Sequence, residues 1–274
     1  MIPDSSYGQW TRKQIDFNGF SLSYLEGGKK SYSGDPVLFI HGWSISTEPY
    51  QDSLNALAQK YWVIVPDSPG SGRSQCALSL LSYQTYANCI VQLIERLNLD
   101  RFKLIGHSFG GGVALALAAA IPDQVSSLIV INSTGMPLIS IPDLIQRRFA
   151  ELPQQIAQLR WTICLKIIQA FGYNSIFHGQ HLIEGAQIAL YEDIRPWLKN
   201  IKSPCLVLWG ERDYFTPIEI GYCIVEAVAN SKLQIVPGRY HEWCIMQPET
   251  FAAIASKFFN QVELETQISY ESSK

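Results

Sequence analysis

The pentapeptide G-H-S-F-G at Gly106–Gly110 carries the clearest chemical signal in the sequence. An apolar run over Phe102–Ile105 precedes it and a run of small residues over Gly111–Ala120 follows it, which predicts a strand, a tight turn and a helix. The two glycines are needed because a side chain there would clash with the neighbouring strand or helix. Such a turn exposes the serine hydroxyl, and the helix N–H groups face developing negative charge. Ser108 is therefore a candidate nucleophile.

A serine hydroxyl is a weak nucleophile and requires a base, which a third group orients. Among the five histidines, His241 follows the predicted strand Leu233–Val236 through a short loop. Active sites of open α/β sheets assemble at such carboxyl strand ends. His107 is expected to point away from the hydroxyl, while His178 and His181 lie far from any predicted strand end and are expected to be solvated or structural. We predict His241 as the base.

The orienting acid is expected in the loop after the predicted strand Cys205–Trp209, where Asp213 stands four residues beyond the strand. Glu211, in the same loop, is the competing acid, and either carboxylate could instead cap the following helix. The chain order Ser108, Asp213, His241 is the order expected for a serine in this kind of turn. We predict Asp213 as the acid.

Strands and helices alternate along most of the chain. Predicted strands are Val37–Ile40, Trp62–Val65, Phe102–Ile105, Ser127–Ile131, Cys205–Trp209 and Leu233–Val236. Predicted helices are Tyr50–Gln59, Tyr83–Leu97, Gly110–Ala120, Glu219–Ala229 and Thr250–Asn260. Because these strands are apolar throughout, both of their faces must be buried. The sequence predicts an α/β domain with a mostly parallel central sheet flanked by helices.

Residues 135–196 break this alternation, since no strand-like run occurs in them and the spacing over Ile156–Phe171 is helical. We interpret them as an inserted helical cap over the carboxyl edge of the sheet. Residues 1–134 and 197–274 then form the core domain. The polar end of the chain, from about Glu265, is expected to fray.

Composition excludes several classes of protein. The 274 residues include 21 Lys+Arg and 24 Asp+Glu, and 47% are hydrophobic. This composition excludes disorder, and the balanced charge argues against nucleic acid as a partner. Six scattered cysteines predict reduced, mostly buried thiols, and paired His or Asp metal ligands are missing, so we expect neither metal nor cofactor. The apolar stretch Leu104–Ile121 is better explained by a strand and a buried helix than by a membrane span. With no signal peptide visible, the sequence predicts a soluble, cytoplasmic protein.

Four motifs in order resemble those of the α/β-hydrolase superfamily, and the resemblance extends from Val37 to about Phe259. They are H-G-W at His41–Trp43, D-S-P-G-S-G-R-S at Asp67–Ser74, the serine pentapeptide, and G-E-R-D at Gly210–Asp213 followed by His241. The resemblance implies the α/β-hydrolase fold with a helical cap. It also implies that the backbone N–H groups of Trp43 and Phe109 form an oxyanion hole, that His41 braces its loop, and that the turn over Asp67–Ser74 is structural.

Family members that cleave epoxides or carbon–halogen bonds carry aspartate at the position of Ser108, so the resemblance disfavours those reactions. The expected reaction is cleavage of a small or medium apolar carboxylic ester through an acyl-enzyme. A carbon–carbon bond hydrolase, a thioesterase, a perhydrolase or a lyase could use the same three residues, and a non-catalytic ligand receptor could retain them. The natural substrate and the oligomeric state stay open.

Aromatic and aliphatic residues of the cap suggest an apolar substrate pocket, for which Trp161 and Phe171 are candidate binding residues, although most such residues are expected to pack the cap onto the core. The stripe from Trp161 to Phe171 could instead lie against lipid as an interfacial helix. We expect a small-molecule ester as partner, with no stable membrane insertion and at most weak interfacial contact.

Overall fold

The computed structural model describes residues 10–28, 30, 34–137, 142–143, 146–147, 149 and 160–272. These residues form one nine-stranded sheet in the order β1-β2-β4-β3-β6-β7-β8-β9, with β5 paired to β2. The strands are β1 (Thr11–Phe17), β2 (Phe20–Gly27), β3 (Val37–Ile40), β4 (Val63–Pro66), β5 (Gln75–Cys76), β6 (Phe102–His107), β7 (Val125–Ile131), β8 (Cys205–Gly210) and β9 (Ser231–Val236). The helices are the short 3-10 helix η2 (Glu48–Tyr50), α1 (Gln51–Ala58), α2 (Tyr83–Arg96), α3 (Phe109–Ala120), α5 (Trp161–Phe177), α6 (Gly179–Tyr191), α7 (Arg195–Leu198), α8 (Glu219–Ala227), α9 (Trp243–Met246) and α10 (Pro248–Ser272).

The predicted fold class is confirmed, because the strands from β4 to β9 along the sheet pair in parallel. Antiparallel pairing is confined to one edge, where β2 pairs with β1, β4 and β5. The apolar stretch that is long enough to span a membrane is strand β6 followed by helix α3. Within the described part of the chain, no helix combines the length and the apolar character that crossing a bilayer requires.

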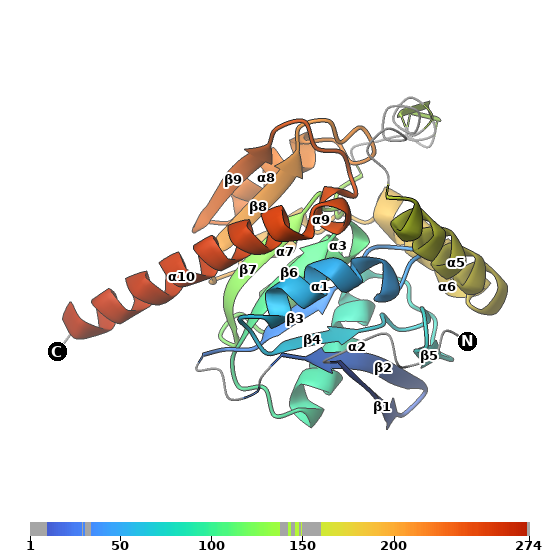
Figure 1. Cartoon of the computed structure of the whole chain (residues 1–274), viewed down its shortest axis with the longest axis horizontal. Coiled ribbons are helices and arrows are strands. Elements are labelled where there is room, and N and C mark those ends of the chain that lie inside the picture. The colour runs from blue at the N-terminus through green and yellow to red at the C-terminus, as the bar shows by residue number, and fades with distance from the viewer. Residues whose placement is uncertain are drawn as a thin grey trace.

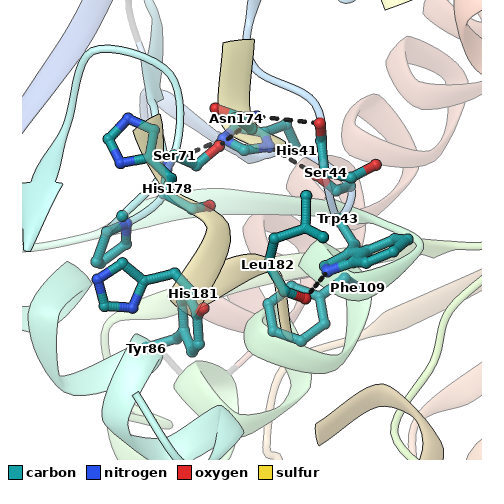
Figure 2. Close-up of a pocket in the computed structure, with 14 residues that line it drawn as sticks. His41, Trp43, Ser44, Ser71, Tyr86, Phe109, Asn174, His178, His181 and Leu182 are labelled. Carbon is teal, nitrogen blue, oxygen red and sulfur yellow. Dashed lines mark hydrogen bonds between the residues drawn. The ribbon is translucent and has the colours of Figure 1, made fainter. Parts of the chain in front are cut away.

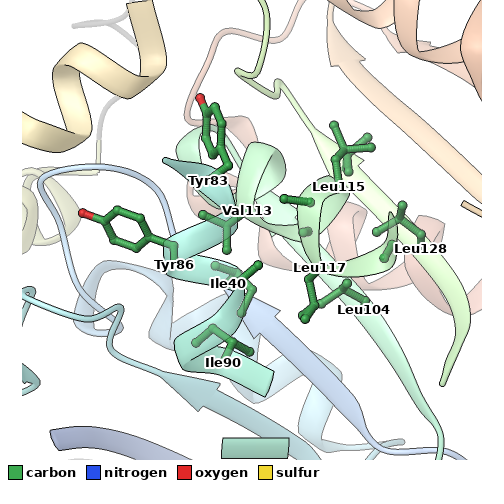
Figure 3. Packing of buried hydrophobic residues seen from close by; sticks show 14 of the residues in the cluster. Ile40, Tyr83, Tyr86, Ile90, Leu104, Val113, Leu115, Leu117 and Leu128 are labelled. Carbon is green, nitrogen blue, oxygen red and sulfur yellow. The ribbon is translucent and has the colours of Figure 1, made fainter. Parts of the chain in front are cut away.

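Two helical layers cover the sheet, and successive residues of one strand enter different cores. Leu38 and Ile40 of β3 pack with α2, α3 and α8, whereas Val37 and Phe39 pack with α1, α9 and α10. Figure 3 shows the first of these cores, with side chains of α3 and β6 in contact. Because both faces of these strands are buried, their sequences are continuous apolar runs.

Helix α3 approaches α2 very closely because its first turn contains three consecutive glycines. A Cβ atom added to Gly112 would lie 2.3 Å from the ring of Tyr83 in α2. The position of α2 is fixed at its start by a capping box, in which Ser82 and Thr85 each accept a hydrogen bond from the other's backbone N–H. The close approach places the start of α3, and with it Ser108, deep in the molecule.

Two regions differ from the sequence-based expectation. The edge strand β1 and its partner β2 are not anticipated, because β1 (T-R-K-Q-I-D-F) is only half-buried and mostly polar. The expected fraying from Glu265 is wrong, since α10 continues to Ser272. Hydrogen bonds between side chains four residues apart, such as Gln261 to Glu265 (2.8 Å), support its polar end.

Helices α5 and α6 lie next to each other at one end of the sheet, outside the two layers (Figure 1). The predicted helix over Ile156–Phe171 corresponds to α5, although residues 156–159 lie outside the described residues. Buried Asn174 ties α5 to the core: its Nδ2 donates to the carbonyls of Ser44 and Ile45, and its Oδ1 accepts from the N–H of Gly72 (2.9 Å). The boundaries of the cap at residues 135 and 196 stay a prediction.

We predict opposite effects of alanine at two glycines within helices. Gly112→Ala should lower the free energy of unfolding by about 1–3 kcal/mol, because its methyl group overlaps the Tyr83 ring. Gly172→Ala in α5, where no atom lies within 4 Å of the added Cβ, should raise it by about 0.5–1 kcal/mol through helix propensity. Urea unfolding of both variants measures the difference. Equal shifts would contradict the packing that we describe for α2 and α3.

Candidate active site

Ser108 occupies a strained turn between β6 and α3. Its φ of 55° and ψ of −122° lie outside the regions that ordinary side chains favour. A Cβ on Gly106 would meet the carbonyl oxygen of Gly110 at 2.3 Å, and a Cβ on Gly110 would meet those of Ile40 and His41 at 2.4 Å. Both glycines are therefore required for strand and helix to approach closely enough, as the sequence predicts.

The structure brings the three predicted side chains together. His241 Nε2 lies 3.0 Å from Ser108 Oγ, and His241 Nδ1 lies 2.9 Å from Asp213 Oδ2. All three residues are buried. Since a carboxylate can only accept, Nδ1 carries the proton and Nε2 accepts from the serine hydroxyl. The competing acid, Glu211, instead accepts a hydrogen bond from the backbone N–H of Gly238 (2.7 Å).

The Asp213 carboxylate is held by several donors besides His241. Oδ1 accepts from the backbone N–H groups of Phe215 (2.8 Å) and Thr216 (2.9 Å). Oδ2 accepts from the Thr216 hydroxyl (2.5 Å) and from the Asn132 side-chain amide. Burial alone would raise the pKa of the Asp213 carboxyl, but the facing His241 and these hydrogen bonds outweigh burial and lower that pKa. The acid therefore stays ionised beside the imidazole.

Asn132 is a residue of the site that sequence reasoning missed. It follows β7 with a left-handed φ of 46° and is fully buried. While its amide donates to Asp213, its Oδ1 accepts from the backbone of Gly210 (3.3 Å) and from the indole of Trp243 (3.0 Å). An asparagine directly after a predicted strand is the only signal that the sequence offers for it.

A cavity of about 400 Å³ opens over Ser108 and His241. Its lining is mostly apolar and comes from the loop after β3, from α5, and from the loops after β8 and β9; the described residues that line it are Gly42, Trp43, Ser44, Ile45, His107, Ser108, Ile167, Ile168, Phe171, Phe215, His241, Glu242 and Ile245. The arrangement can present a carbonyl group to the serine hydroxyl inside an apolar chamber. Such a chamber suits nucleophilic attack assisted by a base.

A family model described as alpha/beta hydrolase fold matches residues 35–160. The chain has the α/β-hydrolase fold. An uncharacterized protein of Mycobacterium tuberculosis (strain ATCC 25618 / H37Rv) is 27% identical to this protein, over 84% of this chain and 77% of its own length. The 2-hydroxy-6-oxo-6-phenylhexa-2,4-dienoate hydrolase of Comamonas testosteroni is 24% identical, over 90% of this chain and 93% of its own. Among solved structures, the enol-lactonase from Burkholderia xenovorans LB400 shares the fold with a TM-score of 0.77 at 20% identity, covering 90% of this chain and 100% of that one.

The two backbone groups expected to form an oxyanion hole flank Ser108. Phe109 is the first residue of α3, where N–H groups have no carbonyl partner within the helix. Trp43 lies in the loop after β3, and its indole donates to the carbonyl of Leu182 in α6 (2.9 Å), as Figure 2 shows. His41 fixes this loop, because Nε2 accepts from the N–H of Ser68 (2.8 Å) and Nδ1 donates to the carbonyl of Gly42 (2.8 Å).

His107 and Tyr50 link the loop after β3 to the backbone of His241. The Tyr50 hydroxyl accepts from the N–H of Gly42 (2.9 Å) and donates to His107 Nδ1 (2.6 Å), while His107 Nε2 donates to the carbonyl of His241 (3.1 Å). Burial lowers the pKa of His107 to about 3, so this ring is neutral and keeps the tautomer that the chain of hydrogen bonds needs. The sequence offers no signal for the part that Tyr50 plays.

The remaining predicted residues lie on or next to helices α5 and α6. The sequence predicts that His178 and His181 are either solvated or structural, and both are structural. Nε2 of His178 donates to the carbonyl of Gly72 (3.0 Å), and Nε2 of His181 donates to the carbonyl of Cys76 (2.9 Å). Phe171 lines the cavity over Ser108. Trp161, by contrast, does not line this cavity, because it lies at the start of α5 with its side chain in solvent.

We predict that Tyr50→Phe lowers the free energy of unfolding by about 1–3 kcal/mol, because it leaves the N–H of Gly42 and Nδ1 of His107 buried and without partners. Tyr83→Phe is the matched control: it also removes a buried hydroxyl, whose bond goes to Thr134 Oγ1 (2.7 Å) alone. The control should destabilise less in urea unfolding. An effect of Tyr50→Phe no larger than that of the control would show that the Tyr50–His107 connection contributes little.

Proposed function

We propose that the protein is a serine hydrolase that cleaves a carboxylic ester of a small or medium apolar substrate through an acyl-enzyme. The observation that carries this proposal is the position of His241, 3.0 Å from the Ser108 hydroxyl and 2.9 Å from the Asp213 carboxylate. A histidine so placed can take the serine proton while the acid stabilises the resulting imidazolium. The site opens into a mostly apolar cavity of about 400 Å³, which supports an apolar substrate.

In the first half-reaction, Ser108 Oγ attacks the ester carbonyl carbon and His241 Nε2 takes the hydroxyl proton. The carbonyl oxygen becomes an oxyanion, which the N–H groups of Phe109 and Trp43 stabilise, each contributing on the order of 3 kcal/mol in sites of this kind. The tetrahedral intermediate then collapses: the bond to the leaving oxygen breaks, and the imidazolium of His241 gives its proton to that oxygen. An alcohol departs and the acyl group stays on Ser108.

In the second half-reaction, water takes the place of the alcohol. His241 removes a proton from the water as its oxygen attacks the acyl carbon, and a second tetrahedral oxyanion forms in the same hole. Collapse breaks the bond to Ser108 Oγ, which recovers its proton from His241. The carboxylic acid leaves, and the enzyme returns to its starting state.

Cleavage of a carbon–carbon bond is the second candidate, favoured by the similarity to a hydrolase of a phenylhexadienoate, which is a carboxylate anion. Among the described residues that line the cavity there is neither lysine nor arginine, and one of them, Glu242, is acidic. A carboxylate that enters an apolar cavity loses its hydration, and without a cation in the lining no interaction compensates for that loss. The lining therefore supports a neutral ester over the anionic substrate.

The six cysteines are all unpaired thiols. Unpaired thiols are typical of proteins in reducing compartments. We propose a cytoplasmic location on this ground.

The role of Ser108 can be tested directly with p-nitrophenyl butyrate. Ser108→Ala should lower kcat/KM by at least about 10³-fold, since it removes the nucleophile. Ser44→Ala, which removes another hydroxyl at the same cavity, is the control and should retain most of the activity. Mass spectrometry of the quenched wild-type enzyme should detect the acyl group on the protein. Ligand binding without turnover of any ester or thioester would instead favour a receptor.

Substrate charge provides a separate test of the cavity. The wild-type enzyme should prefer p-nitrophenyl butyrate to the p-nitrophenyl monoester of succinic acid, which has the same chain length but ends in a carboxylate. We expect the ratio of the two kcat/KM values to exceed about tenfold because the anion loses hydration in the apolar cavity. Rates of hydrolysis by hydroxide correct for intrinsic reactivity. A preference for the anionic ester would favour the dienoate-type reaction.

A further inference from the structure

Helix α5 presents apolar side chains on the side that faces solvent. Its buried residues, Ile163, Ala170 and Asn174, define the inner face that packs on the core. At about 100° per residue, Trp161, Leu165, Ile168, Gly172 and Ile176 fall within a narrow sector on the opposite side. We call these five residues the apolar stripe. None of them carries a charge or a hydrogen-bonding side chain apart from the indole of Trp161.

The stripe is strongly exposed. The accessible fractions are 77% for Trp161, 55% for Leu165, 66% for Ile168 and 77% for Ile176. A Cβ added to Gly172 would meet no atom within 4 Å, so open space continues along the middle of the stripe. Surface helices of globular proteins normally turn a polar face to solvent, and a contiguous exposed apolar patch marks an interaction site.

Rotation of α5 cannot bury the stripe, because the inner face is fixed by specific bonds. The side chain of Asn174 makes hydrogen bonds to the carbonyls of Ser44 and Ile45 and to the N–H of Gly72. The cations near the helix also reach inward: Lys166 donates to Gln51 (2.8 Å) and Arg160 pairs with Asp52 (2.8 Å), both in α1. The stripe is therefore a stable feature of the surface.

The stripe is continuous with the catalytic cavity. Ile168 belongs to both, since it is exposed in the stripe and also lines the cavity over Ser108. Phe171, one turn further along α5, is half-exposed and lines the same cavity. An apolar chain can pass from the stripe into the cavity over apolar surface alone. This continuity argues for an occupant that delivers substrate.

We propose that the apolar stripe of α5 docks on the surface of a neutral or zwitterionic lipid aggregate, and that the substrates are esters with an acyl chain presented at that surface. The second part rests on the proposed ester hydrolysis, whereas docking does not. A second copy of the chain is the alternative occupant, but a copy seated on the stripe would cover Ile168 at the edge of the cavity. The stripe carries no cation, so attachment is by apolar insertion rather than by attraction to anionic headgroups.

The experiment measures flotation of the protein with phosphatidylcholine vesicles, using Ser108→Ala so that the lipid is not consumed. In this background, Leu165→Glu/Ile176→Glu places two charges in the stripe without touching a cavity residue. Leu264→Glu/Ile268→Glu, on the far helix α10, is the matched control, with similarly exposed residues at a helical spacing. We expect the stripe variant to lower the partition coefficient at least tenfold and the control to leave it unchanged. Partial replacement of phosphatidylcholine by phosphatidylglycerol should not strengthen binding.

Three results would overturn docking: no flotation of the parent protein, equal losses in both double variants, or binding to the anionic vesicles alone. A dimer of the parent protein that dissociates on Leu165→Glu/Ile176→Glu, seen by light scattering in the absence of vesicle binding, would assign the stripe to a second copy instead. Turnover of soluble p-nitrophenyl butyrate by the Ser108-containing double variants should be unchanged. If Ser108→Ala retains that turnover while flotation persists, the proposed function fails and docking stands.

Discussion

The close approach of α3 to β6 is the constraint on which the rest of the site depends. Gly106 and Gly110 let the two backbones pass so closely that Ser108 has to adopt a positive φ. The strain is sustained because its backbone is bonded on both sides: the N–H donates to the carbonyl of Ile131 (2.9 Å), and the carbonyl accepts from the N–H of Thr134 (3.1 Å). Since β6 lies between β3 and β7, the loops after both neighbours converge on the serine.

Burial and neighbouring groups determine which of the two histidines nearest Ser108 can carry a positive charge. The rings of His107 and His241 lie with their centroids 5.1 Å apart, so two positive charges there would repel. The pKa of His107 is lowered to about 3, chiefly by burial, which leaves it neutral. Of these two histidines, only His241 is hydrogen-bonded to the ionised Asp213, which Asn132 and Thr216 also hold. A proton taken from Ser108 is therefore stabilised on His241 and nowhere else in the site.

Much of the fold, and the three side chains proposed for catalysis, could be predicted because their signals are local. Short segments of the sequence are enough to identify apolar strands that are buried on both faces. The same segments show that a serine, an acid and a histidine each follow such a strand. The roles of Asn132 and Tyr50 could not be predicted, because both depend on partners far along the chain. Asn132 bonds to Asp213, about 80 residues away, and Tyr50 bonds to His107, 57 residues away. The edge strand β1 is not predicted, because a half-exposed strand carries polar residues and lacks a continuous apolar run.

The cap illustrates a different limit of sequence reasoning. Helix α5 carries apolar residues on both its packed and its outer face, so periodicity cannot tell the two faces apart. Of the 17 large hydrophobic side chains exposed in the described residues, nine belong to α5 and α6. Their concentration there, beside the cavity, is not what scattered surface hydrophobics would produce. Charged residues make up only 16% of the chain, and the exposed apolar surface that accompanies this low proportion is concentrated on α5 and α6. The apolar residues of α5 and α6 form two surfaces, one packed around the cavity over Ser108 and one facing outward.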